Sequence, residues 1–513
     1  MKRKTLLYGL RLVVIGLTIL IELWFTIGVA YKLSETYVYV RLSLSVIGII
    51  ISVSIMNKYE AAVYKMPWLI VFTAAPILGI ILYLSFAVHL RPKKRDKTNN
   101  FINNGDGVPT LSDKLNKFGG AVKYLETACS VCAYTDTDSE FLPTGEEYFK
   151  RLIEELDKAE SYIFMEYFII QQGKMFSAIL NSLKTAAERG VKVYLVYDDV
   201  GSIAKVGAAF NLKLKKTGVN ARVFRRFAPI VTAFHNNRDH RKITVIDGVV
   251  AFTGGVNLAD EYINEIKPYG RWCDTGAVIY GGAVKEFKKA FIETYNACGK
   301  EKLCGDDFKD GKMDFATANE NGQKAASEFR GVVTPYFDAP YPVDDEHVGE
   351  NLYLDLINRS DKSLYITTPY FIVDTNIIEA IKRAVKRGVE VKIIIPEIPD
   401  KKGVYALTKS NAAILNDCGA EIYMFRGGFI HSKLLISDGK AYTVGTVNFD
   451  YRSFAHHFEC GVFVVGASSV SVAEKAFKEL INTECFKAGK KDLSLSFVEK
   501  IKKTLMFLFI PLM

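Results

Sequence analysis

Cysteine is scarce in this chain of 513 residues, and its eight copies are scattered along the sequence. Only Cys129 and Cys132 are closely spaced, and neither a second such pair nor histidine at matching spacing accompanies them. Because a structural zinc site takes four ligands of this kind, the pair does not predict one. Scattered cysteines favour free thiols in a reducing compartment over a disulfide framework.

Ionised residues are rare in three long stretches near the N-terminus. These apolar stretches are Leu6–Ala30, Val38–Met56 and Met66–Leu90. A helix needs roughly 20 apolar residues to cross a bilayer, so the stretches predict an α-helical membrane region over residues 1–97, with two or three transmembrane helices. A cleaved signal peptide does not explain them, because they continue past its usual length. Three buried core helices are the alternative.

Basic residues flank these stretches, and the chain carries a net charge of +9. A positive charge favours anionic partners, either nucleic acid or acidic lipid, and the apolar stretches favour lipid. The clusters at Lys2–Lys4 and Arg91–Lys97 would lie on opposite sides with three transmembrane helices, and on one side with two. The apolar stretches predict a multi-pass protein of the cell membrane. Since the second cluster is larger, the positive-inside rule predicts that the remainder of the chain lies on the cytoplasmic side.

Beyond about residue 145, helical and strand-like stretches alternate, and their order repeats. In the first half, helix, strand, helix and strand are expected at Glu146–Lys158, Ser161–Ile170, Phe176–Arg189 and Val191–Tyr197. In the second half, the same order is expected at Asn351–Arg359, Ser363–Phe371, Asn376–Arg387 and Val389–Pro396. This alternation predicts an α/β fold with two duplicated lobes, each a mixed sheet flanked by helices.

Composition marks the boundaries between the predicted domains. A polar linker is expected over 98–140, the first lobe over 141–304, a polar insertion over 305–345 and the second lobe over 346–490. Residues 491–513 combine lysines with apolar side chains. They predict either a basic, apolar tail at the membrane surface or a C-terminal helix docked on the domain.

One sparse motif occurs twice, at a constant offset of 191 residues. It consists of His-x-Lys-x4-Asp followed by Gly and Asn. The first copy is His240, Lys242, Asp247, Gly254 and Asn257, and the second is His431, Lys433, Asp438, Gly445 and Asn448. Five such residues at one offset indicate a duplicated lobe that brings two His/Lys/Asn sets to one site.

Two imidazoles flanked by two ammonium groups suit chemistry on a phosphodiester. One histidine can attack phosphorus, the other can transfer protons, and the lysines can hold the anionic oxygens. The Asp-Gly pairs predict hairpin turns between two strands. Asp247 and Asp438 are therefore candidate catalytic residues that equally well serve to fix the hairpin or a nearby cation.

These residues resemble the phospholipase D superfamily and, within it, the bacterial cardiolipin synthases. The segments that carry the resemblance are Asn237–Lys242, Thr253–Asn257, Thr368–Phe371, Gly427–Lys433 and Gly445–Ser453. The resemblance extends from about residue 40 to the end of the chain, except for an insertion over residues 305–340. It implies a two-step transfer in which His240 is the nucleophile and His431 the acid/base, although two nearly symmetric motifs leave the reverse assignment open.

The resemblance also implies roles for other side chains. Lys242, Lys433, Asn257 and Asn448 would stabilise the non-bridging oxygens, so that no metal or cofactor is needed. An acid that orients the histidine would be Asp274 for the first motif and Glu459 for the second, unless Glu459 is an ordinary strand carboxylate. The family more often has Arg at the position of Cys273 and Asn at the position of His457.

The function implied by the resemblance is that of a membrane phosphatidyltransferase, which converts two phosphatidylglycerol molecules into cardiolipin and glycerol. Its partners would be phosphatidylglycerol and anionic membrane lipid, without nucleic acid, and the oligomeric state stays open. A phospholipase D-type hydrolase, or a transferase with another alcohol acceptor, is the alternative. A nuclease of the superfamily is less favoured because of the apolar stretches, and two complete His/Lys/Asn sets disfavour a non-catalytic scaffold.

Overall fold

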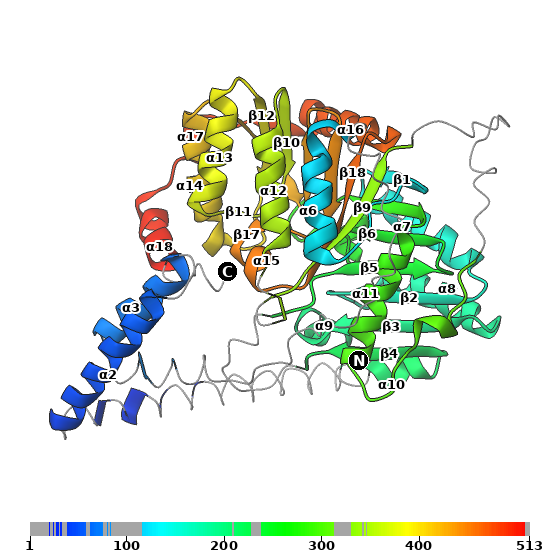
Figure 1. The fold of residues 1–513 in the computed structure, drawn as a ribbon, viewed down its shortest axis with the longest axis horizontal. Coiled ribbons are helices and arrows are strands. Elements are labelled where there is room, and N and C mark those ends of the chain that lie inside the picture. The colour runs from blue at the N-terminus through cyan, green and yellow to red at the C-terminus, as the bar shows by residue number, and fades with distance from the viewer. Residues whose placement is uncertain are drawn as a thin grey trace.

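The computed structural model describes residues 38–57, 62–74, 115–207, 210–226, 237–311, 330–340, 343–344 and 346–507, with a few single positions before residue 84. Two large sheets lie beside each other, and helices pack against them (Figure 1). Helices α2 and α3 extend away from both sheets (Figure 1). The two sheets correspond to the two predicted lobes.

The first sheet has the strand order β1-β8-β6-β5-β2-β3-β4. It is mixed, because β2 runs parallel to β3 and antiparallel to β5. Its strands are β1 (Thr137–Leu142), β2 (Tyr162–Tyr167), β3 (Lys192–Asp198), β4 (Val219–Phe224), β5 (Lys242–Ile246), β6 (Val250–Gly254) and β8 (Gly276–Gly281). Its helices are α7 (Gly145–Lys158), α8 (Lys174–Glu188), α9 (Asp199–Val206), α10 (Phe210–Lys215) and α11 (Val284–Ala297).

The second sheet has the order β19-β13-β12-β10-β15-β16-β18-β9. Its strands are β9 (Val332–Asp338), β10 (Ser363–Thr367), β12 (Glu390–Pro396), β13 (Glu421–Phe425), β15 (Leu434–Ser437), β16 (Ala441–Gly445), β18 (Glu459–Val465) and β19 (Cys485–Lys487). Its helices are α6 (Gly119–Cys129), α12 (Val348–Arg359), α13 (Thr375–Lys386), α14 (Lys402–Asp417), α15 (Tyr451–Ala455), α16 (Ser468–Glu484), α17 (Lys490–Leu493) and α18 (Phe497–Phe507).

The two sheets match strand for strand. Reading from β1 and from β9, the order β1-β8-β6-β5-β2-β3-β4 corresponds to β9-β18-β16-β15-β10-β12-β13, and β19 is added at the far edge. The parallel and antiparallel pairings also agree, since β10 runs parallel to β12 and antiparallel to β15. The predicted α/β fold with duplicated lobes is confirmed by this correspondence.

Helix α13 illustrates why these segments fold as they do. The Asp374 side chain caps its N-terminus by accepting a hydrogen bond from the backbone N–H of Ile377 at 3.0 Å. Ile377, Ile381 and Ala384 follow helical spacing and are fully buried in the core of the second lobe. Gly388, with φ of 88°, directly follows the C-cap, as expected for a helix stop.

The two lobes share a continuous hydrophobic core. Phe141 of the first lobe packs edge-on against Tyr442 of the second, with ring centroids 5.7 Å apart. Phe287 and Phe337 form a second such pair at 5.6 Å. Interior packing of this kind resists relative movement, so the lobes hold their two motifs in a fixed relation.

Two predicted domain boundaries need correction. Helix α6 and most of β1 lie within the expected linker 98–140, and β9 lies within the expected insertion 305–345. Both strands complete sheet edges, and α6 packs its apolar face into the core of the second lobe. The composition of each stretch as a whole concealed them, because each element fills only part of its stretch and the residues around it are polar.

The predicted C-terminal tail begins inside the second lobe. Leu493 of α17 is buried in its core. In α18, Lys503 donates a hydrogen bond to Ser410 of α14 at 2.6 Å, and Met506 packs against a cluster that contains Leu407. One face of α18 is therefore docked on the domain, whereas Phe497 remains 77% exposed.

The described part of the N-terminal region contains α2 (Val38–Met56) and α3 (Ala62–Ala74). Helix α2 has the bounds of the second apolar stretch. Most of the first apolar stretch and much of the third lie outside the described residues. Among the described residues, no helix meets the combined length and apolarity required of a membrane span.

Candidate active site

Two β-hairpins carry the repeated motif. Strands β5 and β6 form the first hairpin, and β15 and β16 form the second, as predicted. Lys242 begins β5, and Lys433 immediately precedes β15. Asn257 and Asn448 follow the returning strands, so each hairpin presents His, Lys and Asn at the same end, and all six of these side chains are buried.

Backbone pairing between the lobes brings the two ends together. The His240 N–H donates to the carbonyl of Phe458 at 2.9 Å, and the His431 N–H donates to the carbonyl of Cys273 at 2.7 Å. The short strand β14 (Gly428–Ile430), which leads to His431, pairs in parallel with β7 (Arg271–Cys273) of the first lobe. Each histidine is thus held against the segment of the other lobe that precedes an acidic residue.

The acids consequently cross over between the lobes. Nδ1 of His240 lies 3.0 Å from both carboxylate oxygens of Glu459, and Nδ1 of His431 lies 2.6 Å from Oδ2 of Asp274. The expectation that each acid serves the histidine of its own motif was wrong. Sequence spacing placed each acid in a lobe correctly, but it contained no information on which histidine that lobe faces.

The surroundings keep both imidazoles neutral. Burial lowers the pKa of His240 well below its usual value, and the ammonium groups of Lys242 and Lys433 lower it further. Burial and Lys433 lower the pKa of His431 to about 4, although Asp274 opposes the shift. A neutral ring with Nδ1–H directed at a carboxylate leaves Nε2 with a free lone pair.

The lysines are buried cations shared by both halves. Lys242 donates to the carbonyl of His240 at 2.6 Å, and Lys433 donates to the carbonyl of His431 and lies 2.8 Å from its Nδ1. Burial lowers the pKa of Lys242 to about 8 and that of Lys433 to about 7. Lys433 influences His240 and Lys242 influences His431, so the two motifs form one electrostatic site.

The asparagines occupy equivalent places with different partners. Oδ1 of Asn257 accepts from the backbone N–H of Ile169 at 2.9 Å, and its Nδ2 donates to the hydroxyl of Tyr262 at 2.7 Å. Oδ1 of Asn448 is buried without a hydrogen-bond partner among the described residues. A buried polar atom left unpaired in this way is available to a bound substrate.

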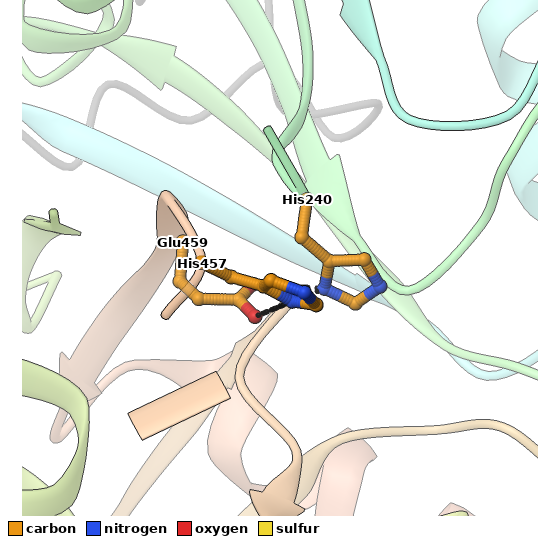
Figure 2. A group of neighbouring side chains, drawn as sticks. All are labelled: His240, His457 and Glu459. Atoms are coloured by element: carbon orange, nitrogen blue, oxygen red, sulfur yellow. Dashed lines mark hydrogen bonds and ion pairs between the residues drawn. The ribbon is translucent and has the colours of Figure 1, made fainter. Parts of the chain in front are cut away.

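Two neighbours of Glu459 were not among the predicted site residues. The Thr446 hydroxyl donates to Glu459, and Nδ1 of His457 lies 3.4 Å from its Oε1. Figure 2 shows His240, His457 and Glu459 gathered at one point, with the two imidazole rings close together; their centroids are 5.1 Å apart. The departure from the family pattern at His457 was the available signal for this contact.

Asp247 and Asp438 do not belong to the site. Asp247 accepts hydrogen bonds from the backbone N–H groups of Glu160, Ser161 and Tyr162 at 2.8 Å each. Asp438 makes the equivalent contacts in the second lobe and also pairs with Lys117. Both occupy left-handed turn positions, with φ of 51° and 56°. The prediction of catalytic roles is corrected: these aspartates fix the turn and the start of the neighbouring strand.

This arrangement defines a class of protein. The site contains two neutral imidazoles, each oriented by a carboxylate and surrounded by buried cations and amides. Such a site suits a reaction in which a phosphorus–nitrogen bond forms and then breaks, so that the enzyme is regenerated. Such a site is that of a two-histidine phosphoryl-transfer enzyme.

The sequence is similar to those of known proteins over most of its length. The family described as "Cardiolipin synthase, PLD-like domain" matches residues 152–292 and 353–481. A cardiolipin synthase of Staphylococcus aureus is 32% identical over 457 residues, which cover 85% of this chain and 90% of that protein. One of Listeria monocytogenes is 31% identical and covers 80% and 86%. The chain therefore belongs to the cardiolipin synthase family of phospholipase D-like proteins.

A solved structure supports the fold. The crystal structure of phosphatidylserine synthase from Haemophilus influenzae Rd KW20 matches with a TM-score of 0.58 at 16% identity, and the match covers 78% of this chain and 100% of that chain. At this level of identity, the likeness extends to the fold alone.

Proposed function

We propose that the protein is a phospholipase D-type phosphatidyltransferase that converts two phosphatidylglycerol molecules into cardiolipin and glycerol. The observation that carries the proposal is that each motif histidine is paired with a buried carboxylate from the other lobe, and that two lysines are shared between them. Membership of the cardiolipin synthase family supports phosphatidylglycerol as the substrate.

The first half-reaction forms a phosphohistidine. Nε2 of His240 attacks phosphorus, the new P–N bond replaces the bond to the glycerol oxygen, and His431 gives a proton to that departing oxygen. The negative phosphodiester favours the protonated form of His431 when substrate binds, and Asp274 stabilises the resulting imidazolium. Lys242 and Lys433 each retain N–H groups that can hold the non-bridging oxygens.

The second half-reaction returns the enzyme to its starting state. A hydroxyl of a second phosphatidylglycerol gives its proton to His431 and attacks phosphorus, and the P–N bond to His240 breaks. The unpaired Oδ1 of Asn448 provides an acceptor that suits a hydroxyl-bearing headgroup. Water in place of the lipid alcohol would yield phosphatidic acid, so the outcome depends on which acceptor reaches the site.

We place this chemistry at a membrane surface, with the N-terminal region embedded in the bilayer and the lobes on the cytoplasmic side. Apolar side chains of α2 are largely exposed, among them Leu42, Ile49 and Ile50 at 58%, 64% and 63%. Phe497 and Val498 of α18 add exposed apolar surface beside lysines. Apolar surface with neighbouring basic residues suits contact with anionic lipid.

A lipid-product assay tests the reaction. Purified wild type, His240→Ala and His431→Ala would receive labelled phosphatidylglycerol in mixed micelles without added metal, and the products would be resolved by mass. We expect cardiolipin and glycerol from the wild type, with a loss of at least about 10³-fold in both variants. Phosphatidic acid as the sole product would show hydrolysis, and a lack of any lipid turnover would contradict the proposal.

The same assay assigns the nucleophile. His431→Ala keeps the proposed nucleophile, so any phosphatidyl group that this variant accumulates should lie on His240. Mass analysis of acid-free digests would locate it. A phosphatidyl group on His431 in the His240→Ala variant would reverse the two roles.

A further inference from the structure

A third histidine distinguishes one half of the site from the other. His457 lies two residues before Glu459 and is 8% exposed. Its Nδ1 is buried without a hydrogen-bond partner among the described residues, although the carboxylate of Glu459 is 3.4 Å away. The phosphatidyl transfer described above gives this nitrogen no task.

The geometry around His457 is that of a metal-binding group. His240, His457 and Glu459 each offer one ligand atom, and these atoms all lie within 4.8 Å of one another. Two imidazole nitrogens and one carboxylate oxygen form a ligand set that zinc uses when a fourth position stays open. Ligands of a tetrahedral zinc ion lie about 3.3 Å apart. Two of the three ligand pairs are close to that value, since Glu459 lies 3.0 Å from Nδ1 of His240 and 3.4 Å from Nδ1 of His457. The two imidazole nitrogens lie within 4.8 Å of each other.

The opposite half of the site provides an internal comparison. Trp272 lies two residues before Asp274, as His457 lies two residues before Glu459. The Trp272 ring packs against His431 at 5.4 Å and 43°, much as the His457 ring packs against His240 at 5.1 Å and 40°. An indole offers no lone pair to a metal, so this half has the same packing without the third ligand.

We propose that His240, His457 and Glu459 bind a single zinc-type dication, and that this ion reversibly switches the active site off. A metal on Nδ1 of His240 places the ring proton on Nε2. Nε2 then has no free lone pair, and it can neither attack phosphorus nor accept a proton, whichever role His240 has. The ion also takes up the carboxylate of Glu459. The inhibition rests on the proposed function, whereas the binding does not.

Neighbouring charges limit the strength of this site. Lys242 and Lys433 lie close enough to His240 to disfavour positive charge on its ring, and both therefore repel a dication bound there. The site therefore suits an ion that binds when its concentration rises and leaves when it falls. Magnesium, which prefers oxygen ligands in octahedral geometry, should not compete.

Binding is measured first, on the full chain in non-ionic detergent without lipid. Calorimetric titration with zinc chloride should show one ion per chain, and titration with magnesium chloride should show none. His457→Phe keeps an aromatic ring against His240 and removes the ligand atom, and His457→Asn provides a second variant of smaller size. In both, zinc affinity should fall at least tenfold. A double Cys129→Ser, Cys132→Ser variant should bind zinc as the wild type does.

Activity is measured second, as the ratio of cardiolipin formation with and without zinc in each variant. Zinc should inhibit the wild type and chelation should restore it, whereas the ratio in His457→Phe should shift toward one. Zinc affinity that is unchanged by both His457 substitutions, or lost with the cysteines, would overturn the proposed site. Binding that depends on His457 without inhibition would retain the site and overturn the switch. If the chain forms no cardiolipin at all, the calorimetry still decides whether the site exists.

Discussion

The two halves of the active site share a plan but hold their histidines differently. Glu459 reaches His240 and receives an additional hydrogen bond from the hydroxyl of Thr446. Asp274 reaches His431 and receives a hydrogen bond from the backbone N–H of Thr275 at 2.8 Å. The longer acid is thus fixed by a side chain, and the shorter acid by the backbone.

The residue that lies beside each acid also differs between the two lobes. Gly255 in the first lobe has the place that Thr446 has in the second, because each follows the motif glycine. A Cβ atom at Gly255 would lie 2.0 Å from Oδ1 of Asp274. The carboxylate therefore occupies the volume that a side chain fills in the other lobe, so each acid and its neighbour form a compensating pair of residues.

The largest effect is expected from the acids themselves. Glu459→Gln and Asp274→Asn keep the size of the side chain, but an amide stabilises an imidazolium far less than a carboxylate does. Each should lower the rate of cardiolipin formation by about 10³-fold or more, as loss of the orienting acid does in other histidine-dependent enzymes. The rate would be measured with labelled phosphatidylglycerol.

The crossed pairing can be tested in the same two variants. Imidazole NMR of selectively labelled protein should show Glu459→Gln moving the Nδ1 signal of His240, and Asp274→Asn moving that of His431. Each variant should leave the other histidine nearly unchanged. The opposite pattern, in which each acid affects the histidine of its own repeat, would contradict the crossing.

The sequence was a sufficient guide wherever a property is local. The duplicated α/β order follows from hydrophobic periodicity, and the Asp-Gly turns at Asp247 and Asp438 follow from the φ values that such turns require. The His/Lys/Asn sets were found because both copies keep one spacing. What depends on how the lobes meet could not be found in this way: the crossing of Glu459 to His240 is set by packing between sheets.

The next largest effect tests the compensating pair. Gly255→Ala forces the carboxylate of Asp274 away from His431, because that buried group has little room to move. We expect activity to fall by about 10²-fold, with a loss of stability of about 1–3 kcal/mol from overpacking. Activity per folded enzyme and thermal unfolding would be measured together.

Thr446→Ala is the matched change in the other lobe. It removes one hydrogen bond to Glu459 without a collision, so activity should fall only about tenfold. Thr446→Ser, which keeps the hydroxyl, should retain most activity. If Gly255→Ala proved milder than Thr446→Ala, the account of the two acids as differently supported would be wrong.

The two lysines should differ in their pH dependence. The ammonium form exists below the pKa, which is about 7 for Lys433 and about 8 for Lys242. As the pH rises, Lys433 in the free enzyme loses its proton first, and the charge that binds phosphate is lost with it. We expect kcat/KM to fall about tenfold between pH 6 and pH 8.

Arginine variants separate the two contributions. A guanidinium stays protonated throughout this range, so Lys433→Arg should be less active but nearly independent of pH between 6 and 8. Lys242→Arg should keep the decline near pH 7. A decline that persists in Lys433→Arg and disappears in Lys242→Arg would exchange the roles of the two lysines.

The smallest effect on activity is expected at the two hairpin aspartates, where the halves differ in stability. Asp247→Asn and Asp438→Asn keep a residue that tolerates the left-handed turn, and each should cost about 1–2 kcal/mol in the free energy of unfolding through weaker hydrogen bonds to backbone N–H groups. Asp438→Asn should cost more, because Lys117 also loses a partner.

Burial opposes ionisation of Asp438, but Lys117 and the backbone donors hold its pKa below the usual value. Its contribution is therefore present above about pH 4 and is lost as the pH falls further. Thermal unfolding at pH 7 and pH 3 would measure the stability lost in each variant. A large loss of activity per folded molecule in either variant would show that these aspartates act in catalysis.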